Sequence, residues 1–356
     1  NLTTKIEIAK YYKLAADNGD VDAMFSYASI LYDGIGVSPN KKEALKYYKL
    51  AADQGDDDAI YDYALMLLKG DGSDNKVNDD DKKEAAIYFK RSADNGNSDA
   101  MFNLASMLKD GDGISIDKKE AAKYFKLAAN KGDNGALNMY ANMLYEGDGI
   151  EENKVEAAML YKESADNGNT EAMFNLALML KDGDGVPENK EEAAKYFKLA
   201  ADNGDLDSMI IYAFMVYKGE GVSIDLKEAL KYYKEAADRG DSEAMFNYAC
   251  MVEKGEGIES NSREAAKYYK KSAKLGNTNS MNNYASLIYN DILKDKENED
   301  ENENKNMSKY EECLKYFKLS ADNGNVEGMY NYGMILKQDQ TNIKNKEISQ
   351  ITDFSF

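Results

Sequence analysis

Few side chains of this chain belong to the types that usually carry out catalysis or bind metals. The 356 residues contain no histidine, which removes the commonest general base and the commonest metal ligand. The two cysteines, Cys250 and Cys313, lie far apart, so neither a disulfide framework nor a zinc site is predicted. A serine or cysteine nucleophile would also lack its usual base. The sequence therefore predicts a protein that is not an enzyme and that holds no cofactor and no metal.

One acidic loop has residue types that partly match those of a cation-binding loop. Residues 110–113 read Asp-Gly-Asp-Gly, like the start of a calcium-binding loop. The segment lacks an oxygen ligand at the fifth position, where Ile114 stands, and glutamate at the twelfth, where Ala121 stands. It is not a phosphate-binding loop either, because a third glycine is missing and no strand is predicted before it. We therefore expect no ion site here.

Two rows of side chains recur at fixed places and could bind a peptide. An asparagine amide offers both a donor and an acceptor to a peptide unit, and a neighbouring aromatic ring can anchor apolar groups. The alternative is that the aromatic rings belong to the core and the asparagines bond to neighbouring helices, and the sequence leaves both interpretations open. The aromatic row is Phe25, Tyr61, Phe102, Phe174, Phe246 and Tyr330, and the asparagine row is Asn103, Asn175, Asn247, Asn283 and Asn331.

Both rows belong to a repeat of 36 residues that closes on a glycine, as from Gly168 to Gly204. Apolar residues at helical spacing predict two helices in each repeat. An Asp or Asn after the closing glycine predicts the N-cap of the first helix. Before the second helix, Asp or Asn is followed three residues later by Glu, as in Asn153 and Glu156, which predicts a capping box. The closing glycine is predicted to supply the left-handed C-cap conformation.

Counting the repeats predicts the organisation of the whole chain as a solenoid. A lone second helix is expected over 1–19, and a final first helix with a capping tail over 325–356. The spacing lengthens twice, around 73–80 and near 295–306, and the second, acidic insertion is predicted to be disordered. The eight repeats between the two ends are 20–55, 56–96, 97–132, 133–168, 169–204, 205–240, 241–276 and 277–324.

The pattern Ala-x-x-x-Leu/Tyr-Ala, then Gly-x-Gly-Val/Ile, then Ala-x-x-Tyr-Tyr/Phe-x-x-Ala-Ala-x-x-Gly resembles the Sel1-like repeat family, which is related to the tetratricopeptide repeats. The family usually has glycine where this chain has Ala105, Ala141 and Ala177, and tyrosine where it has Leu108, Leu144 and Leu180. The resemblance implies an all-α fold, a right-handed α-solenoid superhelix of antiparallel helix pairs. It also implies an adaptor whose first helices line a concave groove for extended peptides or partner helices.

The net charge of the chain limits the kinds of molecule that it is expected to bind. A net charge of -20 and a pI near 4.6 argue against nucleic acid and anionic membranes as partners. No apolar run reaches the length of a membrane span. We therefore expect a monomeric scaffold for a protein or peptide segment, with a basic segment compatible with the charge. Two unpaired cysteines favour a reducing compartment such as the cytoplasm over the endoplasmic-reticulum lumen.

The sequence leaves two other functions beside this scaffold. The absence of a polar cap before the first helix predicts that the chain is part of a longer protein. The main alternative is therefore the regulatory region of a larger enzyme or signalling protein, whose catalytic domain lies outside this chain. Direct hydrolase activity, as in some cysteine-rich bacterial relatives, is disfavoured because this chain has only two cysteines.

Overall fold

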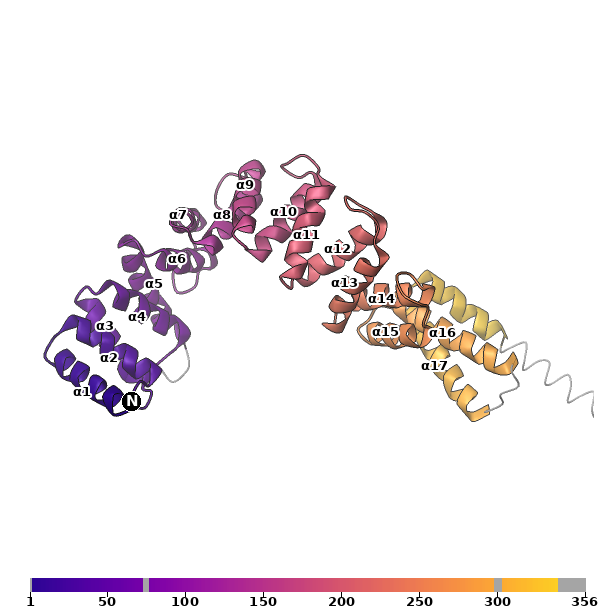
Figure 1. Cartoon of the computed structure of the whole chain (residues 1–356), viewed down its shortest axis with the longest axis horizontal. Helices are drawn as coiled ribbons and strands as arrows, with labels where there is room; N and C mark the ends of the chain where they lie inside the picture. The colour runs from indigo at the N-terminus through magenta and orange to yellow at the C-terminus, as the bar shows by residue number, and fades with distance from the viewer. Residues whose placement is uncertain (1, 73–76, 298–302, 339–356) are drawn as a thin grey trace, which may run out of the picture. The chain divides into compact units, whose positions relative to one another are not determined.

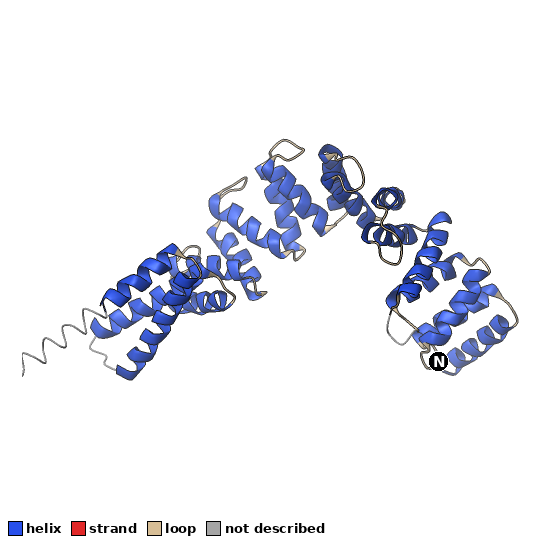
Figure 2. Ribbon diagram, turned by 180° about the vertical axis from the view of Figure 1, so that it is seen from behind, coloured by secondary structure: helices blue, strands red, loops and turns tan. Residues whose placement is uncertain are grey.

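Helices form wherever the repeat places apolar residues at helical spacing between a cap residue and a glycine. The computed structural model describes residues 2–72, 77–297 and 303–338, and within these ranges its regular structure is helical, with no strand (Figures 1 and 2). The chain divides into two compact units, Asn1–Glu188 and Asn189–Phe356.

Helices of alternating first and second type follow one another in both units. Those of the first unit are α1 (Leu2–Asp17), α2 (Val21–Asp33), α3 (Lys41–Asp53), α4 (Asp57–Lys69), α5 (Asp79–Asp94), α6 (Ser98–Asp110), α7 (Lys118–Ala129), α8 (Asn134–Glu146), α9 (Lys154–Asp166) and α10 (Thr170–Asp182). Those of the second are α11 (Lys190–Asp202), α12 (Leu206–Lys218), α13 (Leu226–Asp238), α14 (Ser242–Lys254), α15 (Ser262–Lys274), α16 (Thr278–Glu297), α17 (Glu303–Asp322) and a helix over 326–338.

Within each unit, each of the helices α1 to α17 packs against the next labelled helix along the chain, as α6 does on α7 and α7 on α8. The predicted α-solenoid of paired helices is therefore confirmed. The predicted caps of the first helices are also confirmed. In α10, for example, the side chain of Asn169 accepts a hydrogen bond from the amide of Ala172. The closing Gly168 adopts a φ of 91°, in the left-handed region that favours glycine.

The predicted capping box of the second helices is wrong in its reciprocal half. Asn153 Oδ1 does accept from the amide of Glu156, at 3.1 Å. The backbone amide of Asn153, however, donates at 2.8 Å to the carbonyl of Leu144 in the preceding helix. The Glu156 carboxylate instead accepts from the side-chain Nδ2 of Asn153, at 2.9 Å. At α5 the same spacing in the sequence pairs Asp81 with Glu84, and this prediction is wrong, because Asn78 is the N-cap and forms a complete box with Asp81.

The acidic insertion near 295–306 is only partly as predicted. Helix α16 continues to Glu297 and α17 begins at Glu303, so the expected disorder does not hold for 295–297 or 303–306. Glutamate and lysine are good helix formers, and low apolar content alone does not prevent a helix from extending. Residues 298–302, the insertion residues 73–76 and the predicted capping tail at 339–356 lie outside the described residues.

The loops that follow the first helices contain glycine and acidic residues, and they contact the second helix of the preceding repeat. The loop after α8 places Asp148 Oδ1 2.5 Å from the ammonium of Lys118 at the start of α7. The next residue, Gly149, lies so close to α7 that an added Cβ would be 2.4 Å from Lys118 Cβ. The same contact recurs between Asp184 and Lys154 at 2.9 Å. The carboxylates of these loops therefore serve the contact between repeats.

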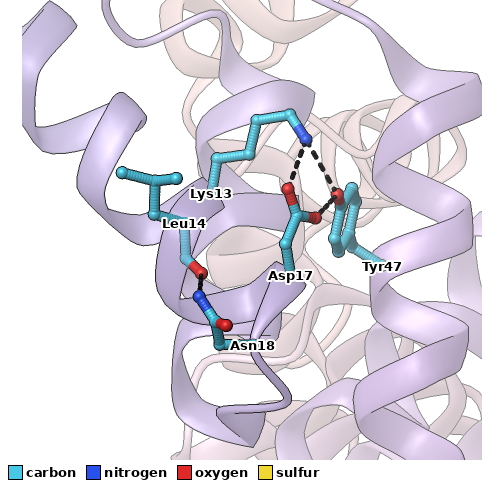
Figure 3. A network of polar contacts seen from close by, with 5 residues as sticks. All are labelled: Lys13, Leu14, Asp17, Asn18 and Tyr47. Atoms are coloured by element: carbon cyan, nitrogen blue, oxygen red, sulfur yellow. Dashed lines mark hydrogen bonds and ion pairs between the residues drawn. The ribbon is translucent and has the colours of Figure 1, made fainter.

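Tyrosine hydroxyls join successive second helices. Tyr47 of α3 donates at 2.5 Å to Asp17 of α1, and Lys13 donates to both, at 2.8 Å to Asp17 and 3.3 Å to Tyr47 (Figure 3). The same contact links Tyr88 of α5 to Asp53 of α3. Hydrogen bonds thus add to the apolar packing between neighbouring repeats.

Buried and half-buried tyrosines predict a loss of stability in alkali. The pKa values of Tyr48, Tyr63 and Tyr88 are raised from 10.0 to about 12, mainly by burial and, for Tyr88, also by the hydrogen bond to Asp53. The neutral form is favoured in the fold, so this stability is complete below pH 10.0 and is lost as the pH rises through about 12. Tyrosinate absorbance should show a class of tyrosines that titrates late. The absorbance titration is simple to interpret because the chain has 27 tyrosines and no tryptophan that would absorb in the same range. In urea the late class should vanish, and its persistence there would contradict burial as the cause.

Candidate protein-interaction site

The first helices α8 and α10 each keep one side away from the core. In α10, Ala172, Met173, Leu176 and Ala177 are buried at helical spacing, so the side chains between them point elsewhere. We call the surface formed by these outward side chains the first-helix face. In this part of the first unit it comprises Asn142 and Glu146 of α8 together with Glu171, Phe174, Asn175, Leu178 and Asp182 of α10.

A pocket of about 500 Å³ opens on this face between α8 and α10. Its floor includes Tyr161, which reaches the pocket from α9, the second helix of the same repeat as α8. The lining thus combines carboxylates, amides, two tyrosines and two apolar side chains. The lining residues are Asn142, Tyr145, Glu146, Tyr161, Glu171, Asn175, Leu178, Met179, Asp182 and Asp184.

A hydrogen-bond network centred on Asn142 crosses the pocket. Tyr161 donates its hydroxyl to Asn142 Oδ1 at 2.6 Å, and Asn175 Nδ2 donates to the same oxygen at 3.2 Å. Asn142 Nδ2 in turn donates to Glu171 Oε1 at 3.2 Å. The network therefore links α9 to α8 and α8 to α10, and it fixes the orientation of both asparagine amides.

The pocket is strongly negative. Hydrogen bonds from Lys154 and Tyr145 hold the pKa of Asp184 below its ordinary value, and Asp182 lies 2.8 Å from Lys181. Within the part of the chain that the structure describes, Glu146 and Glu171 form no ion pair. Burial raises the pKa of the Tyr161 hydroxyl, and the charges of these two glutamates raise it further. Their negative potential thus reaches the pocket floor.

The aromatic row is packed on one side and accessible on the other. Phe25, Tyr61, Phe102, Phe174 and Phe246 are all half-buried, whereas Tyr330 is 67% exposed. Four of these rings contact an aromatic ring of the second helix in the same repeat. The ring centroids lie 5.7 Å apart for Phe25 and Tyr48, 5.9 Å for Tyr61 and Phe89, 5.5 Å for Phe102 and Phe125, and 6.0 Å for Phe246 and Tyr269.

The asparagine row is half-buried as well, and four of its five amides bond to nearby groups. Asn103 donates to the carbonyl of Asp99 in its own helix at 2.8 Å, and Asn175 donates to Asn142 of α8. Asn283 donates to the Tyr269 hydroxyl at 3.2 Å, and Asn331 to Asn282 Oδ1 at 2.9 Å. Asn247 is half-buried on α14. The geometry thus contains features of both interpretations, since four of the five amides are anchored to the fold while the residues stay partly accessible.

Comparison with known proteins agrees with this architecture. The Sel1 repeat profile matches residues 9–20, 21–56, 57–97, 98–133, 135–169, 170–205, 206–241, 242–277 and 305–325. The chain belongs to the Sel1 repeat family. No curated protein is significantly similar to it in sequence.

Solved structures of Sel1 repeat proteins have the same fold. One is a protective antigen of uropathogenic Escherichia coli with an SLR fold, which is 27% identical with a TM-score of 0.81, over 93% of this chain and 67% of that one. Another is a Sel1 repeat protein from Oxalobacter formigenes, which is 25% identical with a TM-score of 0.56, over 70% of this chain and 96% of that one.

The pocket of this Sel1 repeat protein uses residues that sequence reasoning missed. The rows were defined by recurring Phe and Asn, but α8 has Asn138 and Met139 at those places. Asn142 lies one helical turn further on, at a position where the repeats differ from one another, and this variability was the available signal. The residues at that position are Ser29, Leu65, Ser106, Asn142, Leu178, Phe214, Cys250 and Ser286.

The Sel1 repeats are poor in groups that bind metals or enter membranes. Among the described residues, no group of three or more His, Cys, Asp or Glu side chains is arranged to hold a metal ion. Over the same residues, no helix combines the length and apolar character needed to cross a membrane. Burial raises the pKa of the Cys250 thiol, which disfavours the reactive thiolate.

Proposed function

We propose that this protein is a non-enzymatic scaffold whose first-helix face binds an extended segment of a protein partner. Sel1 repeat proteins are generally protein-interaction scaffolds, and their fold is typically non-catalytic. The observation that carries the proposal for this chain is the pocket between α8 and α10, which Asn175 of the asparagine row lines. Phe174 adjoins Asn175 on α10, and the same pair recurs as Phe102 and Asn103 on α6, which would let a segment of a partner lie across several repeats.

The physical state of these side chains suits binding. A ring that already packs on one side loses little conformational freedom when a ligand covers the other side. Asn175 is held by its bond to Asn142, and among the described residues its Oδ1 accepts no hydrogen bond. That oxygen can accept from a peptide N–H without first breaking a bond in the protein. The proposed binding residues are those of both rows, with Phe174 and Asn175 central.

The test is a double substitution, Phe174→Ala with Asn175→Ala. We expect loss of the proteins that the wild-type chain captures from cells, because the variant removes an apolar anchor and an adjacent amide. Quantitative mass spectrometry of captured proteins is the measurement, and circular dichroism establishes that the variant is helical at the assay temperature.

The matched control removes two apolar side chains from another surface of the first unit. Val155 and Met159 of α9 are 54% and 63% exposed, and neither lines the pocket. The variant Val155→Ala with Met159→Ala should capture the same proteins as the wild type. Unchanged capture by the folded Phe174/Asn175 variant would show that partners bind elsewhere.

A further inference from the structure

We infer that the pocket between α8 and α10 receives a positively charged side chain, lysine or arginine, from a basic segment of the partner. The inference rests on the proposed function and adds the chemistry of the partner. Four carboxylates line the pocket, and no lysine or arginine does. Lys154 and Lys181 engage Asp184 and Asp182, which leaves Glu146 and Glu171 without a counter-charge among the described residues.

The hydrogen-bonding groups of the pocket also favour a ligand rich in donors. The Tyr161 hydroxyl and the amide nitrogens of Asn142 and Asn175 all donate to oxygens of the pocket itself. What remains to face a ligand is mainly carboxylate and amide oxygen, which only accepts. Lysine offers three N–H donors and arginine five, and neither side chain needs a donor from the protein.

The walls of the pocket suit the stem of such a side chain. Leu178, Met179 and the rings of Tyr145 and Tyr161 give the pocket apolar surface beside its carboxylates. Lysine and arginine bury their methylene stems against apolar surface while their charged ends reach polar groups. A guanidinium can in addition stack on a tyrosine ring.

The negative lining of the pocket is not common to all repeats. One repeat earlier, Lys109 stands where Tyr145 is, and Gly135 where Glu171 is. Two repeats later, Lys218 takes the place of Glu146. A lysine at either position would repel a basic ligand. The fold by itself therefore does not create the pocket, which depends on side chains that α8, α9 and α10 bring together.

The experiment measures fluorescence anisotropy of three labelled peptides with the whole chain at physiological salt. The peptides alternate glycine with arginine, with lysine, or with citrulline, which keeps the shape of arginine but lacks its charge. We expect the arginine and lysine peptides to bind and the citrulline peptide to bind about tenfold more weakly or worse. The tighter of the two basic peptides identifies the preferred side chain.

Matched variants separate the pocket from the general attraction of a chain with a net charge of -20. Glu146→Gln with Glu171→Gln should weaken the arginine peptide by about tenfold, and Glu151→Gln with Glu163→Gln by less than about twofold. All four glutamates are exposed, so both variants should fold. Equal weakening in both variants, equal affinity for citrulline, or no binding by the wild type would overturn the inference.

The outcomes also distinguish this inference from the proposed function. If basic peptides fail to bind while the Phe174/Asn175 variant loses its partners, the first-helix face binds proteins and only the basic side chain is wrong. If the pocket binds the arginine peptide while partner capture survives the Phe174/Asn175 substitutions, the proposed role of the two rows is wrong and recognition of a cationic side chain stands.

Discussion

Replacing Gly149 with alanine is expected to lower the free energy of unfolding by about 3 kcal/mol or more. Gly149 has a φ of 78°, which L-residues rarely adopt. The added Cβ would lie 2.4 Å from Lys118 Cβ and 2.7 Å from its carbonyl carbon. Backbone at the start of α7 cannot move aside as a flexible side chain can. Relief of this clash would separate the loop from α7 and lengthen the ion pair between Asp148 and Lys118.

Gly132 provides a control for the conformational part of this effect. Its φ is 94°, but a Cβ built on it would have no heavy atom within 4 Å. Gly132→Ala should therefore cost only the strain of the left-handed conformation, about 1–2 kcal/mol. The measurement is urea-induced unfolding followed by circular dichroism. Equal shifts of the midpoint for the two variants would show that the contact of Gly149 with α7 adds nothing to stability.

Much of the fold could be predicted because its signals are local. An Asp or Asn N-cap, a glycine C-cap and apolar residues at helical spacing act within one or two turns, so Asn169, Gly168 and the buried face of α10 were all identifiable from sequence. Repetition strengthened each signal. The wrong prediction of a reciprocal capping box shows where such local signals fail. The backbone amide of Asn153 bonds to the carbonyl of Leu144, which lies in another helix. The spacing of residues within one helix does not predict a hydrogen bond that forms only when two helices pack together.

The candidate site was harder to predict for the same physical reason. Asn142, Tyr161 and Glu171 lie on three different helices, and their hydrogen bonds depend on how two repeats pack. Reasoning from recurrence selects what all repeats share, whereas this pocket depends on what one pair of repeats does not share with the others. Asn175 was found because it belongs to a recurring row. Its bond to Asn142 was not foreseen, because asparagine occurs at that position only in α8.

Replacing Phe102 and Phe125 with alanine, one at a time, should lower the free energy of unfolding by unequal amounts. Phe125 of α7 is 0% exposed, and truncating such a ring to alanine should cost about 3–5 kcal/mol of unfolding free energy. Phe102 of α6 is half-buried, so Phe102→Ala loses less contact and should cost about half as much. Their ring centroids lie 5.5 Å apart at an interplanar angle of 71°, an edge-to-face arrangement.

A double-mutant cycle in urea unfolding measures how the two rings share this stability. The double variant should show a coupling of about 1 kcal/mol between the rings, since edge-to-face pairs contribute beyond the area that they bury. A cost for Phe102→Ala as large as that for Phe125→Ala would contradict the half-buried state and place the aromatic row in the core. The smaller cost would mean that the fold does not need the outer side of Phe102, which leaves that side for a ligand.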